Sequence, residues 1–142
     1  MKTINIALLG FGTVARGAID LLTGNKKEIT NRTDVDITIS KIYVRDPKKH
    51  EDKTLPVGTQ FVTDVTDIMM DDSIDIVVEL MGGTTFAKEC VEAALKAKKN
   101  VVTANKDLMA EAGPYLFDLA GKNGVDLRFE AAVLGAIPII RT

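Results

Sequence analysis

Three small residues near the amino terminus have the spacing of a phosphate-binding turn. Gly10, Gly12 and Ala15 stand in the stretch LLGFGTVARGA, which fits the pattern G-x-G-x-x-G/A. In that pattern the first glycine makes a tight turn, the second lets the backbone approach a pyrophosphate, and the third position keeps a helix close to a strand. The free N–H groups of the helix N-terminus then face the phosphates. The spacing therefore predicts dinucleotide binding; a strand-to-helix corner without a ligand is the alternative.

A second candidate binding position follows the stretch DITISKIYV. Arg45 comes directly after its last apolar residue, and Lys48 and Lys49 follow closely. An arginine here favours a cofactor with a 2′-phosphate, whereas an acidic residue would bind the ribose 2′-hydroxyl, a role open to the adjacent Asp46. We therefore expect NADP to be preferred over NAD. For the two lysines, a solvated charged turn is an equally good interpretation.

The single cysteine and the single histidine carry no predicted chemistry. Cys90 lies in an apolar helical stripe, away from basic neighbours that would stabilise a thiolate, so we interpret it as a core residue. His50 lies in the charged stretch DPKKHEDK, which predicts a solvated surface residue. One histidine alone also makes no metal site.

The elements that must position these residues alternate between strand-like and helix-like stretches. Continuous apolar, β-branched runs predict buried parallel strands in INIALLG, DITISKIYV, IDIVVEL, NVVTA and VDLRFEAAV. After the first strand, helical spacing predicts a helix whose apolar face is Val14, Ala18, Leu21 and Leu22. The polar stretch TGNKKEITNRTD is then expected to carry the chain away from it.

Three further helices are predicted. TDVTDIMMDD indicates a short helix, and GPYLFDLAGKNG has an apolar stripe of Leu116, Leu119 and Ala120 that Gly124 ends. A helix is also predicted between IDIVVEL and NVVTA, with Thr84 or Thr85 as its N-cap. Its apolar stripe consists of Phe86, Cys90, Ala93, Ala94 and Ala97.

This alternation predicts an α/β fold, a doubly wound parallel sheet of Rossmann-like type, in which ligands bind beyond the carboxyl ends of the strands. The 142 residues fit one domain, residues 1–142. The 18 basic and 20 acidic residues give a net charge of −2, and their scatter argues against a nucleic-acid surface. No run of apolar residues is long enough for a membrane span, and the single cysteine fits a cytoplasmic protein.

Longer motifs resemble a known family. VVELMGG at 77–83 and NVVTANKDLMAEAG at 100–113, together with GFGTV and EAAVLGAIPII, resemble the amino-terminal NAD(P)-binding domain of homoserine dehydrogenase over essentially the whole chain. That family interconverts L-homoserine and L-aspartate 4-semialdehyde with NAD(P), on the route to threonine and methionine. Ala15 replaces the usual third glycine, and Leu134 and Ala136 stand where the family commonly has glycine.

The resemblance implies a set of site residues. Lys106 is the implied catalytic residue, because an ammonium at the end of a strand would reach the nicotinamide edge and the substrate oxygen together; a lysine that only caps the strand end is the alternative. The implied cofactor-binding residues are Gly10, Phe11, Gly12, Thr13, Val14, Gly82, Gly83, Thr84, Thr103 and Lys106, to which we add Arg45. In the family, main-chain carbonyls also bind a monovalent cation such as Na⁺, a ligand type that suits hard cations. The matching positions are Glu130, Val133, Gly135 and Ile137.

The resemblance also implies a following domain that is absent from this chain. In the family that domain carries the substrate-binding carboxylates and a second catalytic lysine, and it forms a homodimer. We therefore expect the chain to bind cofactor without turnover, and its cation site to be empty in isolation. Two alternatives are a dinucleotide-sensing regulatory domain, which would not need Lys106, and an aspartate-semialdehyde dehydrogenase-like domain, marked by a cysteine nucleophile in a following domain.

Overall fold

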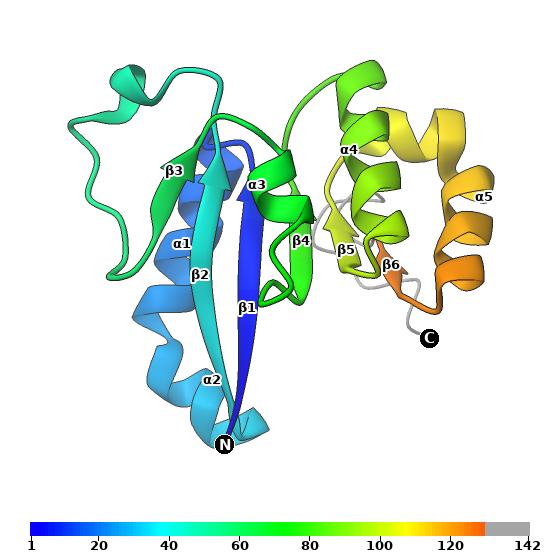
Figure 1. Ribbon diagram of the computed structural model, residues 1–142. Coiled ribbons are helices and arrows are strands. Elements are labelled where there is room, and N and C mark those ends of the chain that lie inside the picture. Colours follow the sequence, from blue (N-terminus) through cyan, green and yellow to red (C-terminus); the bar gives the residue numbers. More distant parts are fainter. Residues whose placement is uncertain (130–142) are drawn as a thin grey trace.

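A six-stranded parallel sheet forms the centre of the protein (Figure 1). The computed structural model describes residues 1–129. The strand order is β3-β2-β1-β4-β5-β6, for the strands β1 (Lys2–Leu9), β2 (Val35–Tyr43), β3 (Gln60–Val62), β4 (Ile76–Glu79), β5 (Asn100–Thr103) and β6 (Leu127–Arg128). The helices are α1 (Thr13–Gly24), α2 (Lys26–Thr33), α3 (Thr66–Met69), α4 (Thr85–Lys96) and α5 (Lys106–Asn123), with a 3₁₀ turn η1 (Pro47–His50). The predicted doubly wound α/β fold is confirmed.

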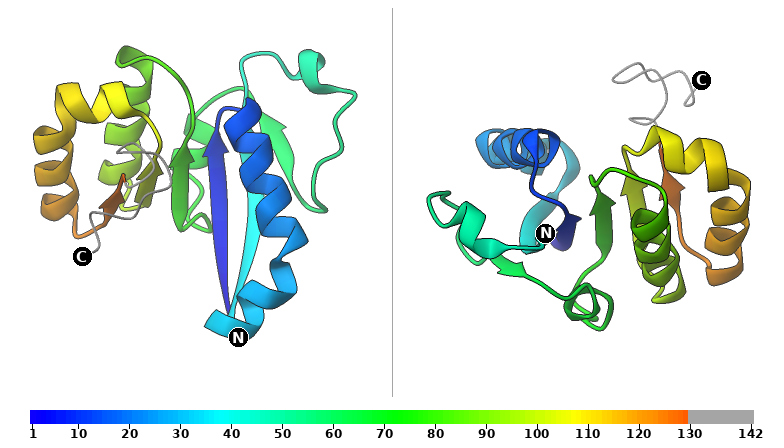
Figure 2. Two further views of the ribbon diagram at one scale, coloured as in Figure 1. Left: turned by 180° about the vertical axis from the view of Figure 1, so that it is seen from behind. Right: turned by 90° about the horizontal axis from the view of Figure 1, so that it is seen from above.

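Helices lie on both faces of the sheet, which therefore has two cores. Figure 2 shows α1 on one side and α4 and α5 on the other. Leu8 belongs to the same buried cluster as Ala15 and Ile19 of α1. Its neighbour Leu9 belongs to the opposite cluster, with Val91 of α4 and Leu116 of α5. Because the second half of this central strand is buried on both faces, residues 6–9 are all apolar rather than alternating.

The buried face of α1 agrees only in part with the predicted one, in which Leu22 does pack against the core. Ala15 and Ile19 are buried, whereas Val14 and Leu21, which we expected to face the core, are 62% and 61% exposed. The small side chain of Ala15 lets the helix approach the sheet closely there, and the buried stripe follows from that contact. Apolar spacing alone was a poor guide because two overlapping stripes run along this helix.

The polar stretch that we expected to connect α1 to the sheet is instead α2. This helix has no buried residue, so no apolar period could reveal it. Its surface carries an ion pair between Glu28 and Arg32, with 3.0 Å between Oε1 and Nη2, at the i, i+4 spacing that supports exposed helices. The three-residue strand β3 was likewise not predicted, being too short to show a period.

The helix before the last strand is longer than predicted. It begins at Lys106 and runs through Pro114. Asn105 caps it, since its Oδ1 accepts a hydrogen bond from the Leu108 N–H at 3.0 Å. Gly124 ends it in the left-handed region, with φ 67°, as predicted. The short helix α3 and the burial of Cys90 on α4 are also confirmed, and Thr84 precedes α4 without a side-chain cap.

Candidate functional site

A cavity of about 470 Å³ opens at the carboxyl ends of β1, β2 and β4. Three segments far apart in the sequence form it: the glycine turn, the segment after β2 and the loop after β4. The lining residues are Gly10, Phe11, Gly12, Tyr43, Val44, Arg45, Asp46, Lys49, His50, Met81, Gly82 and Phe86. The chain leaves β1 toward β2 and leaves the adjacent β4 toward β5, so the cavity lies at the switch point of the sheet, where such folds bind ligands.

The two glycines of the turn differ in their surroundings, since Gly10 is closely packed and Gly12 lies beside open space. Gly10 has φ +103°, and a Cβ there would lie 3.3 Å from both Leu80 O and Met81 Cγ, so the fold itself requires glycine. Gly12 precedes α1 and is exposed, and a Cβ there would meet no atom within 4 Å. The space beside Gly12 is therefore open to a ligand that approaches the first turn of α1.

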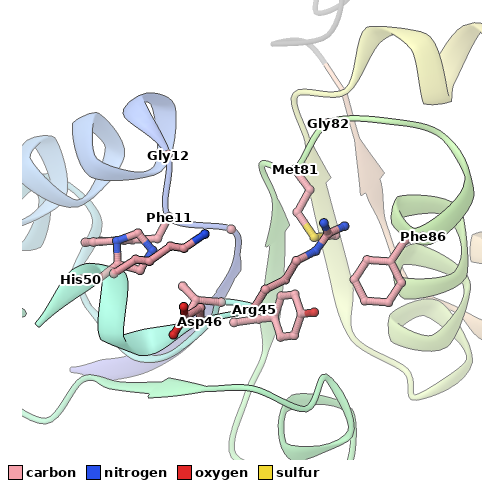
Figure 3. Close-up of a pocket in the computed structure, with 12 residues that line it drawn as sticks. Phe11, Gly12, Arg45, Asp46, His50, Met81, Gly82 and Phe86 are labelled. Carbon is pink, nitrogen blue, oxygen red and sulfur yellow. The ribbon is translucent and has the colours of Figure 1, made fainter.

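His50 forms part of one wall of the cavity and is not the solvated residue that its charged neighbours predicted. Its ring centroid lies 5.1 Å from that of Phe11, edge to face, and 5.7 Å from that of Phe61. Figure 3 shows Phe11 and His50 together on one side of the cavity. The turn η1 folds His50 back onto β3, a contact between distant segments that local charge does not reveal.

Arg45 reaches across the cavity toward the opposite wall. Its side chain points to Met81 and Phe86 (Figure 3). Asp46 is partly engaged in local structure, because its Oδ1 accepts a hydrogen bond from the Lys48 N–H at 3.1 Å. The structure thus brings a guanidinium into the cavity and uses one oxygen of the competing carboxylate to cap η1.

The predicted site residues fall into two groups. Those that line the cavity are Gly10, Phe11, Gly12, Arg45 and Gly82. Those that lie outside its lining are Thr13, Val14, Gly83, Thr84, Thr103 and Lys106. Lys106 is exposed and is the first residue of α5, directly beyond the carboxyl end of β5. It lies at the same edge of the sheet as the cavity, because parallel strands end together.

Two buried polar residues at this edge were missed by the sequence analysis. Glu79, the last residue of β4, is 0% exposed, and Asn105 is 7% exposed. The Glu79 carboxylate accepts hydrogen bonds from the Met81 N–H at 2.8 Å and from the Thr103 hydroxyl at 2.6 Å. Burial raises the pKa of Glu79 above its ordinary value, although these hydrogen bonds oppose the shift. The acid at the end of the apolar run IDIVVEL was the available signal.

Asn105 connects the end of β5 to the loop after β4. Its N–H donates to the Thr103 hydroxyl oxygen at 3.0 Å, and its Nδ2 donates to the Gly83 carbonyl at 2.6 Å. Since its Oδ1 also caps α5 at Leu108, every polar group of this side chain is used. The first turn of α5 is thereby attached to the loop that borders the cavity.

Cys90 is a buried core residue, as predicted. It is 2% exposed, and burial raises the pKa of its thiol to about 11, with the Glu79 charge acting in the same direction. Residues 1–129 hold no cluster of three or more His, Cys, Asp or Glu side chains that suits a metal ion. The predicted cation ligands Glu130, Val133, Gly135 and Ile137 lie outside this described part of the chain.

No helix among the described residues combines the length and hydropathy needed to cross a membrane.

The parallel sheet, the glycine turn and the cavity at the switch point define a dinucleotide-binding domain of the Rossmann class. The chain belongs to the homoserine dehydrogenase family: the family described as "Homoserine dehydrogenase, NAD binding domain" matches residues 10–130.

Relatives and solved structures agree with this assignment. The chain is 49% identical over 142 residues to homoserine dehydrogenase of Lactococcus lactis, covering 99% of this chain and 33% of that protein. It is 41% identical to that of Bacillus subtilis, covering 100% of this chain and 33% of the relative. The homoserine dehydrogenase structure from Thiobacillus denitrificans superposes with a TM-score of 0.90 at 44% identity, over 99% of this chain and 32% of that one. The chain thus spans about a third of the length of its curated relatives.

A more distant structure shares the fold. A hyperthermophilic archaeal homoserine dehydrogenase, solved in complex with NADPH, superposes with a TM-score of 0.78 at 23% identity. The likeness covers 97% of this chain and 47% of that one.

Proposed function

We propose that this chain is the NADP-preferring cofactor domain of a homoserine dehydrogenase that reversibly converts L-homoserine to L-aspartate 4-semialdehyde. The parent enzyme is here the longer protein that contains this chain and the domain implied by its full-length relatives. The observation that carries the proposal is the open backbone at Gly12, which faces a cavity that also holds the Arg45 guanidinium. The archaeal relative solved with NADPH supports the choice of ligand.

The proposed cofactor-binding residues come from segments on two sides of the cavity, which we call the cofactor groove. Residues 10–14 would bind the pyrophosphate, since the missing side chain of Gly12 exposes the first N–H groups of α1. Residues 82–84 would border the cofactor on the other side, and Thr103, which is buried and bonded to Glu79, would support that side from behind. Arg45 would bind a 2′-phosphate with two parallel hydrogen bonds, and Lys49 adds a second cation to the same lining.

The proposed catalytic residue is Lys106. When bound, the cofactor supplies the acceptor for the hydride that leaves the alcohol carbon of homoserine. The exposed Lys106 ammonium would stabilise negative charge on the substrate oxygen as the hydroxyl proton passes to solvent and the alcohol becomes a carbonyl. We assign substrate binding, the second lysine and dimer formation to the following domain, so the 142-residue chain would bind cofactor without turning substrate over. A monovalent cation at Glu130, Val133, Gly135 and Ile137 belongs to the same proposal.

Substitution of Gly12 tests the proposal. A Cβ at Gly12 would meet nothing within 4 Å, so the fold should persist with valine there, but the valine side chain would occupy the space of the pyrophosphate. We expect Gly12→Val to abolish NADPH binding, measured by fluorescence titration, with an unchanged thermal unfolding temperature. Gly17→Val is the matched control, because a Cβ at this exposed position on α1 also meets nothing within 4 Å. Equal NADPH affinities of the wild-type chain and Gly12→Val would overturn the proposal.

A further inference from the structure

We infer that Glu79 is a positioning residue, which holds the loop 81–83 and the first turn of α5 in one arrangement and so places Lys106 relative to the cofactor. The inference rests on the proposed function, because it concerns the same groove. It assigns Glu79 no contact with cofactor or substrate.

Glu79 lies where a charge is most costly to bury. It ends β4 and is paired in register with Leu9 of β1 and Thr103 of β5, so strands flank it on both sides. Among residues 1–129 no lysine, arginine or histidine forms an ion pair with it. A buried carboxylate without a counter-ion persists only where hydrogen bonds replace its hydration. Both of its hydrogen bonds come from segments that border the proposed cofactor groove, namely Met81 and Thr103.

The hydrogen bonds close a ring across the edge of the sheet. From Glu79 the ring runs through the Thr103 hydroxyl to the Asn105 N–H, and from the Asn105 side chain to the Gly83 carbonyl. The backbone then returns to Met81, whose N–H donates to Glu79. Lys106 follows Asn105 directly, so the ring determines where the helix that carries Lys106 begins.

The directions of these bonds suit an acid at this position. The Thr103 hydroxyl accepts from the Asn105 N–H and donates its own hydrogen to Glu79, since an ionised carboxylate can only accept. The Met81 N–H is a second donor to the same side chain. A carboxylate offers an acceptor oxygen to both donors, whereas a glutamine of the same shape presents an NH₂ group to one of them. Glu79→Gln therefore either loses the bond from Met81 or reverses the bond to Thr103, and it removes the charge that both donors face, without changing the packed volume.

The experiment compares Glu79→Gln, Lys106→Ala and the double variant in the parent enzyme. We expect Glu79→Gln to lower kcat for homoserine oxidation by about tenfold to a hundredfold, because small displacements of a catalytic group have effects of this size. In the Lys106→Ala background the same substitution should change kcat by less than about twofold, since its effect acts through Lys106. Thr103→Val, which removes the other side of the hydrogen bond, should reproduce the loss caused by Glu79→Gln.

Lys99→Met is the matched control, because Lys99 is also buried and held by two hydrogen bonds, at the opposite edge of the sheet. We expect it to lower the unfolding temperature and leave kcat unchanged. A wild-type kcat in Glu79→Gln, or an undiminished effect in the Lys106→Ala background, would overturn the inference.

A separate measurement distinguishes an error in the proposed reaction from an error in the role of Glu79. If the wild-type parent enzyme does not oxidise homoserine, the proposed reaction is wrong, and NADPH titration of this chain then tests Glu79. Glu79→Gln should weaken NADPH binding through the loop 81–83 while Lys99→Met does not. Equal affinities of wild type and Glu79→Gln, or no NADPH binding by the wild type, would overturn the inference in that case.

Discussion

The two ends of β4 and β5 each bury one ionisable side chain, and the two side chains hold different parts of the molecule. At the amino ends, Lys99 is 3% exposed and donates to the carbonyls of Asp71 and Ile74 at 2.6 and 3.0 Å. At the carboxyl ends, Glu79 is 0% exposed and accepts from Met81 and Thr103. Lys99 therefore closes the turn that leads into β4, whereas Glu79 ties together segments next to an open cavity.

This difference shows that burial of a charge does not by itself identify a functional site. Both side chains exchange hydration for hydrogen bonds, and both stabilise the fold only while those bonds are satisfied. The two side chains differ in which segments their hydrogen bonds connect. The bonds of Glu79 lead to Gly83 and to the start of the helix that carries the exposed Lys106, while those of Lys99 end in a turn.

The largest expected effect is the loss of Lys106, the lysine that follows β5. Lys106→Ala in the parent enzyme should lower kcat for homoserine oxidation by roughly a hundredfold to a thousandfold, the range found for removal of one group that stabilises an oxyanion. Steady-state turnover with homoserine and NADP measures it. A fully active Lys106→Ala enzyme would remove this lysine from the mechanism, and high activity of the 142-residue chain alone would remove the need for a following domain.

The second effect concerns Arg45, an exposed cation at the carboxyl edge. Arg45→Ala should weaken NADP binding by about tenfold to a hundredfold, because hydrogen bonds between charged groups contribute about 1.5–3 kcal/mol. NAD binding should change by less than about twofold, since NAD lacks the 2′-phosphate. Titration of both cofactors against both proteins measures the difference. Equal weakening of the two cofactors would show that Arg45 does not select the phosphate.

The third effect concerns Lys99, at the amino ends of β4 and β5, and the stability of the fold. Lys99→Met should lower the free energy of unfolding by roughly 1–3 kcal/mol, because one buried and one partly buried carbonyl lose their donor. Thermal unfolding and NADPH titration of the same samples measure stability and binding. If fully folded Lys99→Met binds NADPH more weakly than the wild type, then the amino ends of β4 and β5 also shape the cofactor site. Lys99 and Glu79 would then no longer differ in their effect on that site.

The smallest effect is the pH dependence of stability. Hydrogen bonds from Lys41 and Ser73 hold the pKa of Asp71 well below its ordinary value of 3.8. A depressed pKa contributes stability above the ordinary value, and that stability is lost as the pH falls through and below it. The unfolding temperatures of wild type and Asp71→Asn should therefore converge between about pH 5 and pH 2. The effect is small because partly exposed ion pairs contribute about 0.2–1 kcal/mol.

Glu79 should show the opposite sign in the same measurement. Burial raises its pKa above the ordinary 4.5, so stability is present below that value and is lost as the pH rises through the raised pKa. Relative to Glu79→Gln, the wild type should therefore become less stable with rising pH. Parallel slopes for the Asp71 and Glu79 variants would contradict this difference between the two carboxylates.

Much of the architecture was predictable because local patterns encode it. Strands buried on both faces are continuous apolar runs, and the glycine spacing predicts a tight turn between a strand and a helix. The order of the elements placed Arg45 and Lys106 at strand ends, and the chain motifs identified the family before any contact was known. The errors concern the face of α1 and the presence of α2 and β3, where apolar spacing was ambiguous or absent.

The sequence by itself determined the fold class, the glycine turn and the family, because each depends on residue types at short separations. Only the tertiary structure decided that His50 packs against Phe11 and that Glu79, Thr103 and Gly83 belong to one ring. Thr103 and Glu79 are 24 residues apart, and Asn105 and Gly83 are 22 apart. Such partners meet only when parallel strands align their carboxyl ends, so no local pattern in either segment records that they touch.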